Sequence, residues 1–204
     1  PRRMKKECGM EQEYRELREK LCETARHLYE RGLVSGTDGN ISVRASEDAM
    51  LITPSGVSKR ELEPASLIVQ KLDGTIVSGR GKSSREAKLH AAIYRIRTEI
   101  GAVVHTHPAA ATAFAMCGQT LPDNCLVEVP AVIGKIALAG YAPAGSGKLA
   151  ENVRMAAVDS DVIFMQNHGV VTCGKDLTAA FNKMEMVENA ARTICYAKLL
   201  GGIR

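Results

Sequence analysis

Residues Ala102–Pro108 read AVVHTHP, a short apolar run that ends in two histidines one residue apart. The apolar run is typical of a buried β-strand. Because side chains along a strand alternate between its two faces, His105 and His107 point to the same side. Two neutral imidazoles side by side suit a metal ion, although two hydrogen-bonded histidines at a surface turn would give the same pattern. The stretch therefore raises the hypothesis of a metal site at a strand end.

A second apolar run, VIFMQNHGVV at residues 162–171, repeats this pattern. Its apolar residues predict a buried strand, and His168 follows beside a glycine that allows close approach of backbone or ligand. Three histidines are the usual number of protein ligands for a catalytic zinc with an open fourth position. A turn-capping role for His168 is the alternative. We predict a zinc site formed by His105, His107 and His168.

Glu86 is the acidic residue best placed to join such a site. It follows Ser83 and Ser84 at the expected start of a helix, where a carboxylate is favoured and Ser84 can cap. By itself this position is typical of a capping acid, but beside a divalent metal the carboxylate would ligate the ion or act as a base. His90 falls one helical turn later, and we expect it to be structural or to support a metal ligand.

Three turns in the first half of the chain look suited to bind an anion, namely TDGNIS (Thr37–Ser42), TPSGVSK (Thr53–Lys59) and GKSS (Gly81–Ser84). Each offers backbone N–H groups and hydroxyls without bulk, and the third opens a helix whose positive end favours phosphate. Any one of them is also an ordinary turn, and none matches a nucleotide P-loop. Their occurrence together indicates a phosphomonoester site rather than a dinucleotide site.

The chain of 204 residues has the size of one well-buried domain. We interpret residues 1–9 as a leader or an expression remnant and residues 10–204 as the domain. Interleaved helical and strand patterns predict a single three-layer α/β domain, with a central mixed, largely antiparallel sheet flanked by helices. Helices are expected at Glu11–Arg31, Ser84–Arg97, Ala109–Cys117, Gly147–Val158 and Leu177–Leu200. Strands are expected at Ile41–Arg44, Met50–Thr53, Leu67–Leu72, Thr75–Val77, within Ala102–Pro108, and at Val127–Val129, Ile136–Leu138, Asp161–Gly169 and Val170–Thr172.

Composition and charge disfavour several classes of partner. The net charge is only +4 and there is no Trp, so we expect no nucleic-acid partner, which would need a clustered basic face. No run of eighteen apolar residues occurs, so we expect no membrane span. The six cysteines are scattered and mostly lie in apolar periodic segments, which is typical of free thiols in a reducing compartment. We therefore expect a cytoplasmic protein.

Taken in order, six segments resemble the class II aldolase/adducin family, which includes L-fuculose-1-phosphate aldolases and L-ribulose-5-phosphate 4-epimerases. The resemblance runs from about Tyr14 to Leu200. It rests on GLVSGTDGNISVR, LITPSGVSK, SSREAKLHAAIYR, AVVHTHP, APAGSGKLAENV and QNHGVV. As an ordered set these segments are highly specific for the family and less specific for the reaction.

The resemblance implies a zinc-dependent cytoplasmic enzyme, usually a cyclic homotetramer with active sites at subunit interfaces. It implies that His105, His107 and His168 bind Zn²⁺ and that Glu86 ligates the resting metal or acts as the base. The substrate phosphate would be held by Gly39, Asn40, Ser55, Gly56 and Ser84. Arg85 stands where relatives often have a phosphate-binding serine. It would clamp the phosphate as a bidentate donor, or point away and leave that role to Ser83 and Ser84.

The expected reaction is cleavage of a ketose 1-phosphate, such as L-fuculose 1-phosphate or a similar deoxy sugar phosphate, to dihydroxyacetone phosphate and an aldehyde. A metal Lewis acid would stabilise the enediolate that bond cleavage leaves behind. The alternatives are a 4-epimerase or a sugar-phosphate dehydratase of the same family and, more distantly, a non-catalytic adducin-like scaffold. Retention of all three histidines argues against the scaffold.

Two departures from the family pattern concern the proton donor. An ungapped count from His107 puts Leu126 where the fuculose-phosphate aldolases have a catalytic tyrosine. Counted likewise, Pro130 stands where the epimerases have a catalytic aspartate. Asp123 and Glu128 lie nearby, and a shift of the loop would bring one of them into use. The sequence therefore predicts the metal site and leaves the proton donor open.

Overall fold

The computed structural model describes the backbone of residues 2–123 and 126–202, and side chains from Tyr14 onward. The helical segments are α1 (Arg2–Glu30), η1 (Pro64–Ser66), α2 (Ala87–Ile96), α3 (Ala109–Met116), η2 (Val129–Ile133), α4 (Gly147–Ala156) and α5 (Leu177–Leu199). The strands are β1 (Asn40–Arg44), β2 (Ala49–Ile52), β3 (Ile68–Lys71), β4 (Ile76–Ser78), β5 (Ala102–Thr106), β6 (Ile136–Ala139), β7 (Val162–Met165) and β8 (Gly169–Gly174).

The described strands form one mixed sheet in the order β4-β3-β2-β1-β5-β8-β7-β6. Neighbouring strands are antiparallel except β6 and β7, which are parallel. The histidine-bearing strand β5 is central, between β1 and β8, and all of its residues are buried. It pairs with β8 from Ala102 opposite Gly174 to Thr106 opposite Val170. The predicted fold class is confirmed.

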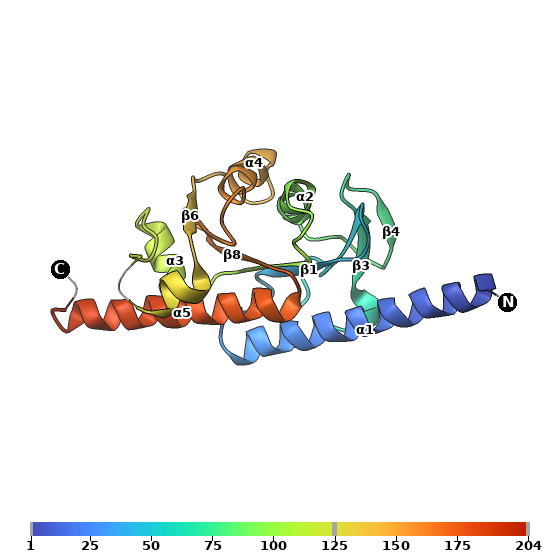
Figure 1. Cartoon of the computed structure of the whole chain (residues 1–204), viewed down its shortest axis with the longest axis horizontal. Helices are drawn as coiled ribbons and strands as arrows, with labels where there is room; N and C mark the ends of the chain where they lie inside the picture. Colours follow the sequence, from blue (N-terminus) through green and yellow to red (C-terminus); the bar gives the residue numbers. More distant parts are fainter. Residues whose placement is uncertain (1, 124–125, 203–204) are drawn as a thin grey trace.

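Helices cover both faces of the sheet (Figure 1). Helices α1 and α5 lie along one face, and α2 and α4 lie on the other. Each face has its own hydrophobic core, and side chains of β5 alternate between the two: Val104 packs into the core with α1 and α5, and Val103 packs into the core with α2 and α4. The three layers make β5 a rigid support, because both of its faces are packed.

The segment Val127–Val129 corrects an expectation. We predict a strand there from its apolar residues, but the chain forms the helical turn η2 from Val129 to Ile133. Pro130 stands at the start of this turn. Proline has no N–H to donate to a strand ladder, and its fixed φ suits the first position of a helical turn. The predicted strand is therefore wrong.

Two helix starts also differ from expectation. Helix α1 begins at Arg2 rather than Glu11, and the interpretation of residues 1–9 as a leader or expression remnant stays a prediction. Helix α2 begins at Ala87 rather than Ser84, because Ser83 forms an isolated bridge with Pro54 that keeps this segment out of the helix. Within the described part of the chain, no helix combines the length and apolar character needed to cross a bilayer.

Candidate active site

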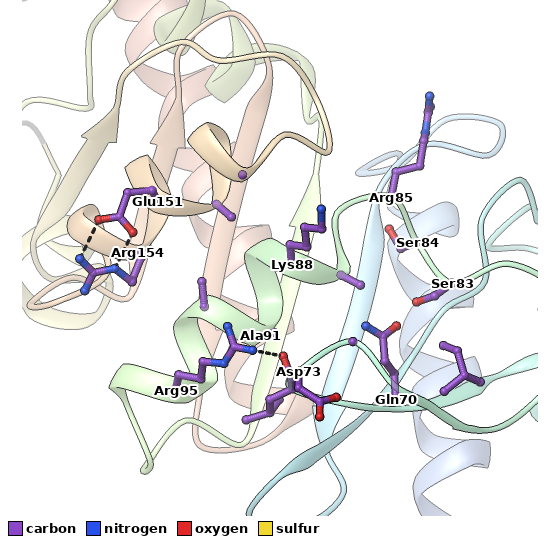
Figure 2. Close-up of a pocket in the computed structure, with 17 residues that line it drawn as sticks. Gln70, Asp73, Ser83, Ser84, Arg85, Lys88, Ala91, Arg95, Glu151 and Arg154 are labelled. Carbon is purple, nitrogen blue, oxygen red and sulfur yellow. Dashed lines mark hydrogen bonds and ion pairs between the residues drawn. The ribbon is translucent and has the colours of Figure 1, made fainter.

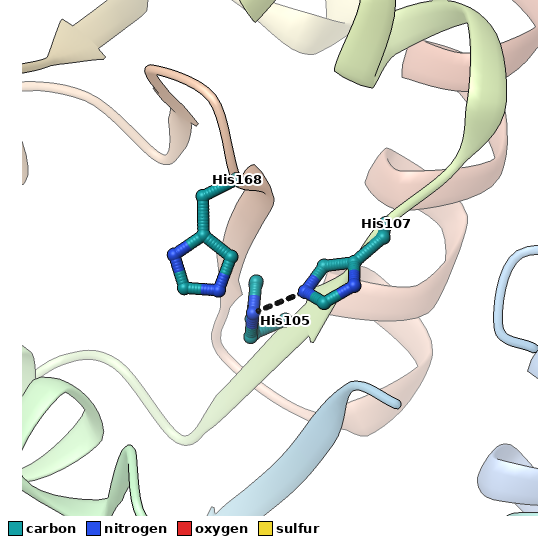
Figure 3. Close-up of side chains that lie close together, drawn as sticks. All are labelled: His105, His107 and His168. Atoms are coloured by element: carbon teal, nitrogen blue, oxygen red, sulfur yellow. Dashed lines mark hydrogen bonds between the residues drawn. The ribbon is translucent and has the colours of Figure 1, made fainter. Parts of the chain in front are cut away.

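His105, His107 and His168 meet where two segments far apart in the sequence become neighbours. His105 lies within the last residues of β5 and His107 directly follows it, whereas His168 lies in the turn between β7 and β8. Because β5 pairs with β8, the turn places His168 beside the end of β5. Figure 3 shows the three rings facing a common space, and their ligand nitrogens all lie within 4.8 Å of one another. The structure thus brings the predicted triad together.

Two of these imidazoles have a polar group beside their Nδ1 atom. The Nδ1 atom of His105 donates to the carbonyl oxygen of Val170 at 2.9 Å, which leaves the lone pair of Nε2 facing the cluster. The Nδ1 atom of His107 lies 3.6 Å from Oδ2 of Asp38. A hydrogen bond like that of His105 is typical of metal-binding histidines, because it fixes both tautomer and ring orientation, whereas Asp38 places a carboxylate near His107 beyond hydrogen-bond distance.

Gly169 leaves the room that this cluster needs. A Cβ atom at Gly169 would lie 2.5 Å from the carbonyl oxygen of Thr106 and 2.6 Å from Cδ2 of His107. Such contacts are far inside van der Waals distance, so any larger residue would displace the His107 ring. Asn167, in the same turn, has a φ of 57°. The conformation of the turn that carries His168 therefore depends on the close approach of Gly169 to Thr106 and His107, as well as on the hydrogen bonds of the turn.

The Glu86 carboxylate points into the histidine cluster rather than capping α2. Its Oε2 atom accepts from Nδ2 of Asn40 at 2.8 Å and lies 3.1 Å from Nε2 of His105. Its Oε1 atom lies 3.1 Å from Nε2 of His168. Burial by itself would raise the pKa of Glu86, but the neighbouring His105 and His168 imidazoles and the hydrogen bond from Asn40 hold it well below its ordinary value. Glu86 is therefore an anion in contact with two of the three histidines.

The cluster fits a tetrahedral metal ion. Ligand nitrogens bound to one zinc at about 2.0–2.1 Å lie about 3.3 Å apart, and the Nε2 atoms of His105 and His107 lie 3.1 Å apart. The Oε1 atom of Glu86 is buried and has no hydrogen-bond partner within the described chain. Burial and the neighbouring histidines lower the pKa of His107 to about 4, so this ring is neutral at pH 7, the form that binds metal. A cation between these groups satisfies all of them.

A cleft of about 310 Å³ opens beside the cluster, with His107, His168 and Glu86 in its wall. The predicted anion-binding residues in the same wall are Gly39, Asn40, Ser55, Gly56, Ser84 and Arg85. Gly39 and Gly56 have φ angles of 67° and 77°, a region that favours glycine. The side-chain amide of Asn40 is engaged with Glu86 and His90, so its side chain faces the acid more than the turns. The three glycine-containing turns therefore converge on one cleft.

Ser83 lies outside this cleft and lines a second cavity of about 590 Å³ between α2, α4 and the β3–β4 hairpin. Ser84 and Arg85 border both spaces. Figure 2 shows the Arg85 side chain extending away from Ser83, Ser84 and Lys88. Arg85 makes no side-chain hydrogen bond or ion pair to any described residue, whereas Arg154 is paired with Glu151. Of the two predicted serines, only Ser84 shares a cleft with the histidine cluster.

Two residues near the cleft escaped the sequence analysis. Asp38, beside His107, lies in the stretch TDGNIS, where it looked like an ordinary turn residue. Lys59 is 1% exposed, and its Nζ donates to the carbonyl oxygens of Thr37 and Val57, which ties two of the anion-binding turns together. Burial lowers the pKa of Lys59 to about 8. Neither residue forms a recognisable pattern by itself, so the sequence alone gives no signal for its role.

Leu126 and Pro130, the two positions that an ungapped count compares with the family's proton donors, both have apolar side chains. The side chain of Leu126 is partly buried and packs against the core on the α5 side, and Pro130 lies in the first turn of η2. Asp123 and Glu128 are both exposed. Neither Leu126 nor Pro130 can donate a proton, and the proton donor stays unassigned.

Residues 19–195 match the Class II Aldolase and Adducin N-terminal domain. The chain therefore belongs to the class II aldolase and adducin family. It is 41% identical over 173 residues to an L-fuculose phosphate aldolase of Methanococcus maripaludis, covering 85% of this chain and 91% of the relative. It is 33% identical over 179 residues to a 3-oxo-tetronate 4-phosphate decarboxylase of Haemophilus influenzae, covering 86% and 85%.

A solved structure of an L-fuculose 1-phosphate aldolase has the same fold. It superposes with a TM-score of 0.86 at 31% identity and covers 91% of this chain and 88% of that chain. Together with the relatives, this likeness supports an aldolase-type lyase of class II. The histidine cluster is the candidate metal centre of that enzyme.

Proposed function

We propose that this enzyme is a zinc-dependent aldolase that cleaves a ketose 1-phosphate to dihydroxyacetone phosphate and an aldehyde. L-Fuculose 1-phosphate or a similar deoxy sugar phosphate is the proposed substrate. The observation that carries the proposal is one cleft that joins three histidines and Glu86 to glycine-containing turns suited to a phosphate. The relative named L-fuculose phosphate aldolase supports the same reaction class.

His105, His107 and His168 would hold the Zn²⁺, with Glu86 as a further ligand of the resting metal. When bound, the ion supplies Lewis-acid stabilisation of the negative charge that develops on the substrate oxygens. The donor set of imidazole nitrogens and one carboxylate suits zinc. Removal of the ion with a chelator, followed by reconstitution with zinc and other divalent metals, would test the identity of the metal.

The substrate phosphate would lie against the turns that contain Gly39, Ser55 and Gly56 and against the hydroxyl of Ser84. Backbone N–H groups and a hydroxyl fix such a group without bulk, and a fixed phosphate holds the reacting carbons next to Glu86. In the condensation direction Glu86 takes the proton from C3 of dihydroxyacetone phosphate, and in the cleavage direction it returns that proton. Its ionised state suits the role of a base.

Decarboxylation is the alternative that the comparisons add, because one relative is named a 3-oxo-tetronate 4-phosphate decarboxylase. A 4-epimerase or a sugar-phosphate dehydratase would use the same metal and phosphate groups. Leu126 and Pro130, at the positions of the aldolase tyrosine and the epimerase aspartate, do not distinguish the aldolase from the epimerase. The products separate these reactions, since only the proposed aldolase reaction releases dihydroxyacetone phosphate and an aldehyde from a ketose 1-phosphate.

We also propose a homotetramer with active sites at subunit interfaces, and a cytoplasmic location. Val127, just before η2, and Val132, within η2, are 81% and 53% exposed, and exposed apolar side chains favour contact with another subunit. The described cysteines are free thiols, which suits a reducing compartment. Light scattering on the purified protein would give its subunit number.

A product assay tests the proposed reaction. Zinc-loaded protein is incubated with a panel of ketose 1-phosphates and, separately, with a 3-oxo-tetronate 4-phosphate, and dihydroxyacetone phosphate and carbon dioxide are both measured. We expect dihydroxyacetone phosphate from at least one ketose 1-phosphate, and its loss in Glu86→Gln. Decarboxylation of the 3-oxo-tetronate 4-phosphate would itself yield dihydroxyacetone phosphate together with carbon dioxide. Carbon dioxide release from that compound, with no aldehyde and no dihydroxyacetone phosphate from any ketose 1-phosphate, would therefore replace the aldolase with a decarboxylase. Equal activity of Glu86→Gln would remove Glu86 from the mechanism.

A further inference from the structure

A row of buried hydrogen bonds runs from the α2 core to the Glu86 carboxylate. Ser42 Oγ lies 2.9 Å from the hydroxyl of Tyr94 and 2.7 Å from Nδ1 of His90. The Nε2 atom of His90 lies 2.5 Å from Oδ1 of Asn40, whose Nδ2 donates to Oε2 of Glu86 at 2.8 Å. Ser42 and His90 are 0% exposed and Glu86, the most exposed member, is 8% exposed. The row is therefore buried from Tyr94 to His90 and meets the cleft only at Asn40 and Glu86.

The chemistry of the two ends fixes the direction of every hydrogen bond in the row. An ionised carboxylate can only accept, so the amide nitrogen of Asn40 faces Glu86 and its oxygen faces His90. The oxygen of an amide also only accepts, so Nε2 of His90 carries a proton. Burial lowers the pKa of His90 to about 3, so the ring is neutral and its Nδ1 accepts from Ser42. Ser42 in turn accepts from Tyr94.

The row leaves the two oxygens of Glu86 in different situations. Oε2 is occupied by Asn40 and faces His105, whereas Oε1 is buried without a hydrogen-bond partner within the described chain and lies 3.1 Å from Nε2 of His168. Oε1 is therefore the oxygen that is free to accept a proton or to bind a ligand. Asn40 and His90 prevent the carboxylate from rotating and exchanging its two oxygens, because rotation would break the bond to Asn40.

We propose that His90 is a positioning residue that acts through Asn40 to hold the Glu86 carboxylate in one orientation, with Oε1 as the oxygen that exchanges the substrate proton. Ser42, by donating to Nδ1, keeps the His90 ring in the tautomer with its proton on Nε2, which donates to Asn40. The proposal rests on the proposed role of Glu86 as the base. Asn40, which the family resemblance assigns to the phosphate, contributes its side chain to the acid instead.

The tautomer of His90 is a direct test that does not depend on activity. The purified full-length protein is labelled with ¹⁵N in its five histidines, and their ring nitrogens are observed by NMR at pH 7. The signal of His90 is identified by its absence in His90→Gln. We expect a neutral ring with its proton on Nε2. A proton on Nδ1, or a charged ring, would overturn the proposal, even if the protein cleaves no ketose 1-phosphate.

Kinetics of matched variants provide a second test. His90→Leu removes the donor to Asn40, and we expect kcat to fall about 10- to 100-fold, as for other groups that orient a metal or catalytic ligand. His90→Gln, whose side-chain N–H reaches the place of Nε2, should recover much of this loss. Ser42→Ala should lower kcat about tenfold and Tyr94→Phe, at the far end of the row, less than about threefold.

Zinc content and the Kd of inorganic phosphate, measured by metal analysis and calorimetry, are the controls for these variants. We expect both to stay within about twofold of the unsubstituted protein, because the three histidines are untouched. Ser42 ends the TDGNIS stretch, but its side chain is buried against His90 and Tyr94 and does not line the cleft. A parallel loss of zinc, phosphate binding and activity would show a merely structural role and contradict the proposal. If His90→Leu does not fold, Ser42→Ala carries the same comparison, and an unchanged kcat in that variant would also contradict it.

Discussion

The two halves of the cleft are built from different kinds of structure. The histidine half consists of His105, His107, His168 and Glu86. The three histidines lie at or next to the ends of packed strands, and Glu86 directly precedes α2. His105 and Glu86 are buried. The turn half consists of residues 37–39, 55–56 and 84–85, which lie in loops, and Ser55, Gly56 and Arg85 are exposed. Each half contributes to the same cleft.

The difference shows how the fold separates two tasks. In the histidine half, side chains are held by partners such as Val170 and Asn40, so its geometry is set before any ligand arrives. In the turn half, the groups offered to a ligand are mostly backbone N–H groups, and the side chain of Arg85 has no partner among the described residues. We therefore expect substitutions in the histidine half to affect metal and turnover, and substitutions in the turn half to affect substrate affinity.

The largest effect is expected for His107→Ala. It removes one of three metal ligands from a site whose remaining groups cannot replace it, so zinc retention and activity should both fall more than about 100-fold. His27→Ala is the matched control, because His27 is exposed on α1 and far from the cluster in sequence and fold. Metal analysis of the purified variants measures the result, and an unchanged zinc content in His107→Ala would remove this residue from the metal site.

A pair of glycine substitutions compares the two halves directly. In Gly169→Ala, the added methyl group would meet Thr106 and the His107 ring, so we expect a loss of about 1–3 kcal/mol in stability and about tenfold weaker zinc binding. In Gly56→Ala, no atom lies within 4 Å of the new Cβ, and only the positive φ opposes it, at about 1–2 kcal/mol.

Zinc titration against a competing chelator and the KM for the phosphorylated substrate separate these two variants. Gly169→Ala should change mainly the zinc affinity, and Gly56→Ala mainly the KM. Equal effects of both variants on zinc affinity would contradict the division of the cleft into two halves.

Two buried groups beside the cleft titrate in different pH ranges: His90, next to the histidine half, and Lys59, next to the turn half. Burial lowers the pKa of His90 to about 3, whereas the unfolded chain has a pKa near 6.5, so the unfolded state takes up a proton first as the pH falls. Stability therefore decreases below about pH 6.5, by up to about 1.4 kcal/mol per pH unit. Burial lowers the pKa of Lys59, beside the turn half, from 10.5 to about 8, so stability increases as the pH rises from about 8 to 10.5.

Denaturant unfolding at a series of pH values measures both slopes. His90→Gln should make the acidic slope shallower, with His107 and Glu86 supplying the rest, and leave the basic slope unchanged. Lys59→Met should flatten the basic slope and leave the acidic one unchanged. If the acidic slope is unchanged in His90→Gln, or the basic slope in Lys59→Met, the pH dependence of stability in that range comes from another group.

The smallest effect is expected for Arg85→Gln in the turn half. Arg85 is exposed and lines the cleft, so loss of its charge should raise the KM for a phosphorylated substrate about three- to tenfold and leave kcat unchanged. The effect should shrink at high salt, because the group is open to solvent. Lys88→Gln is the matched control, since Lys88 is exposed and lines the second cavity instead. An identical KM for Arg85→Gln and the unsubstituted protein would favour the alternative that Arg85 points away from the phosphate.

Much of the fold follows from local patterns in the sequence. The apolar runs of β5 and β7 predict buried strands, and the spacing of apolar residues predicts α2 and α5. The strand predicted at Val127–Val129 is wrong because the helical turn η2 begins there, with Pro130 in its first turn. A short apolar run does not distinguish a strand from a helical turn. The predicted start of α2 is wrong because the bridge between Ser83 and Pro54, which joins residues distant in sequence, cannot be read from the local pattern.

The sequence by itself determined that His105, His107 and His168 could bind a metal and that each stands at or just after the end of a buried strand. Both conclusions depend on local properties, namely the chemistry of a side chain and the alternation of side chains along a strand. Only the tertiary structure decided that β8 lies beside β5, which brings His168 to His105, and that Asn40 and His90 hold Glu86. It also placed Ser83 outside the cleft that Ser84 enters. Strand order and side-chain contacts between distant segments depend on packing of the whole chain, which no single segment encodes.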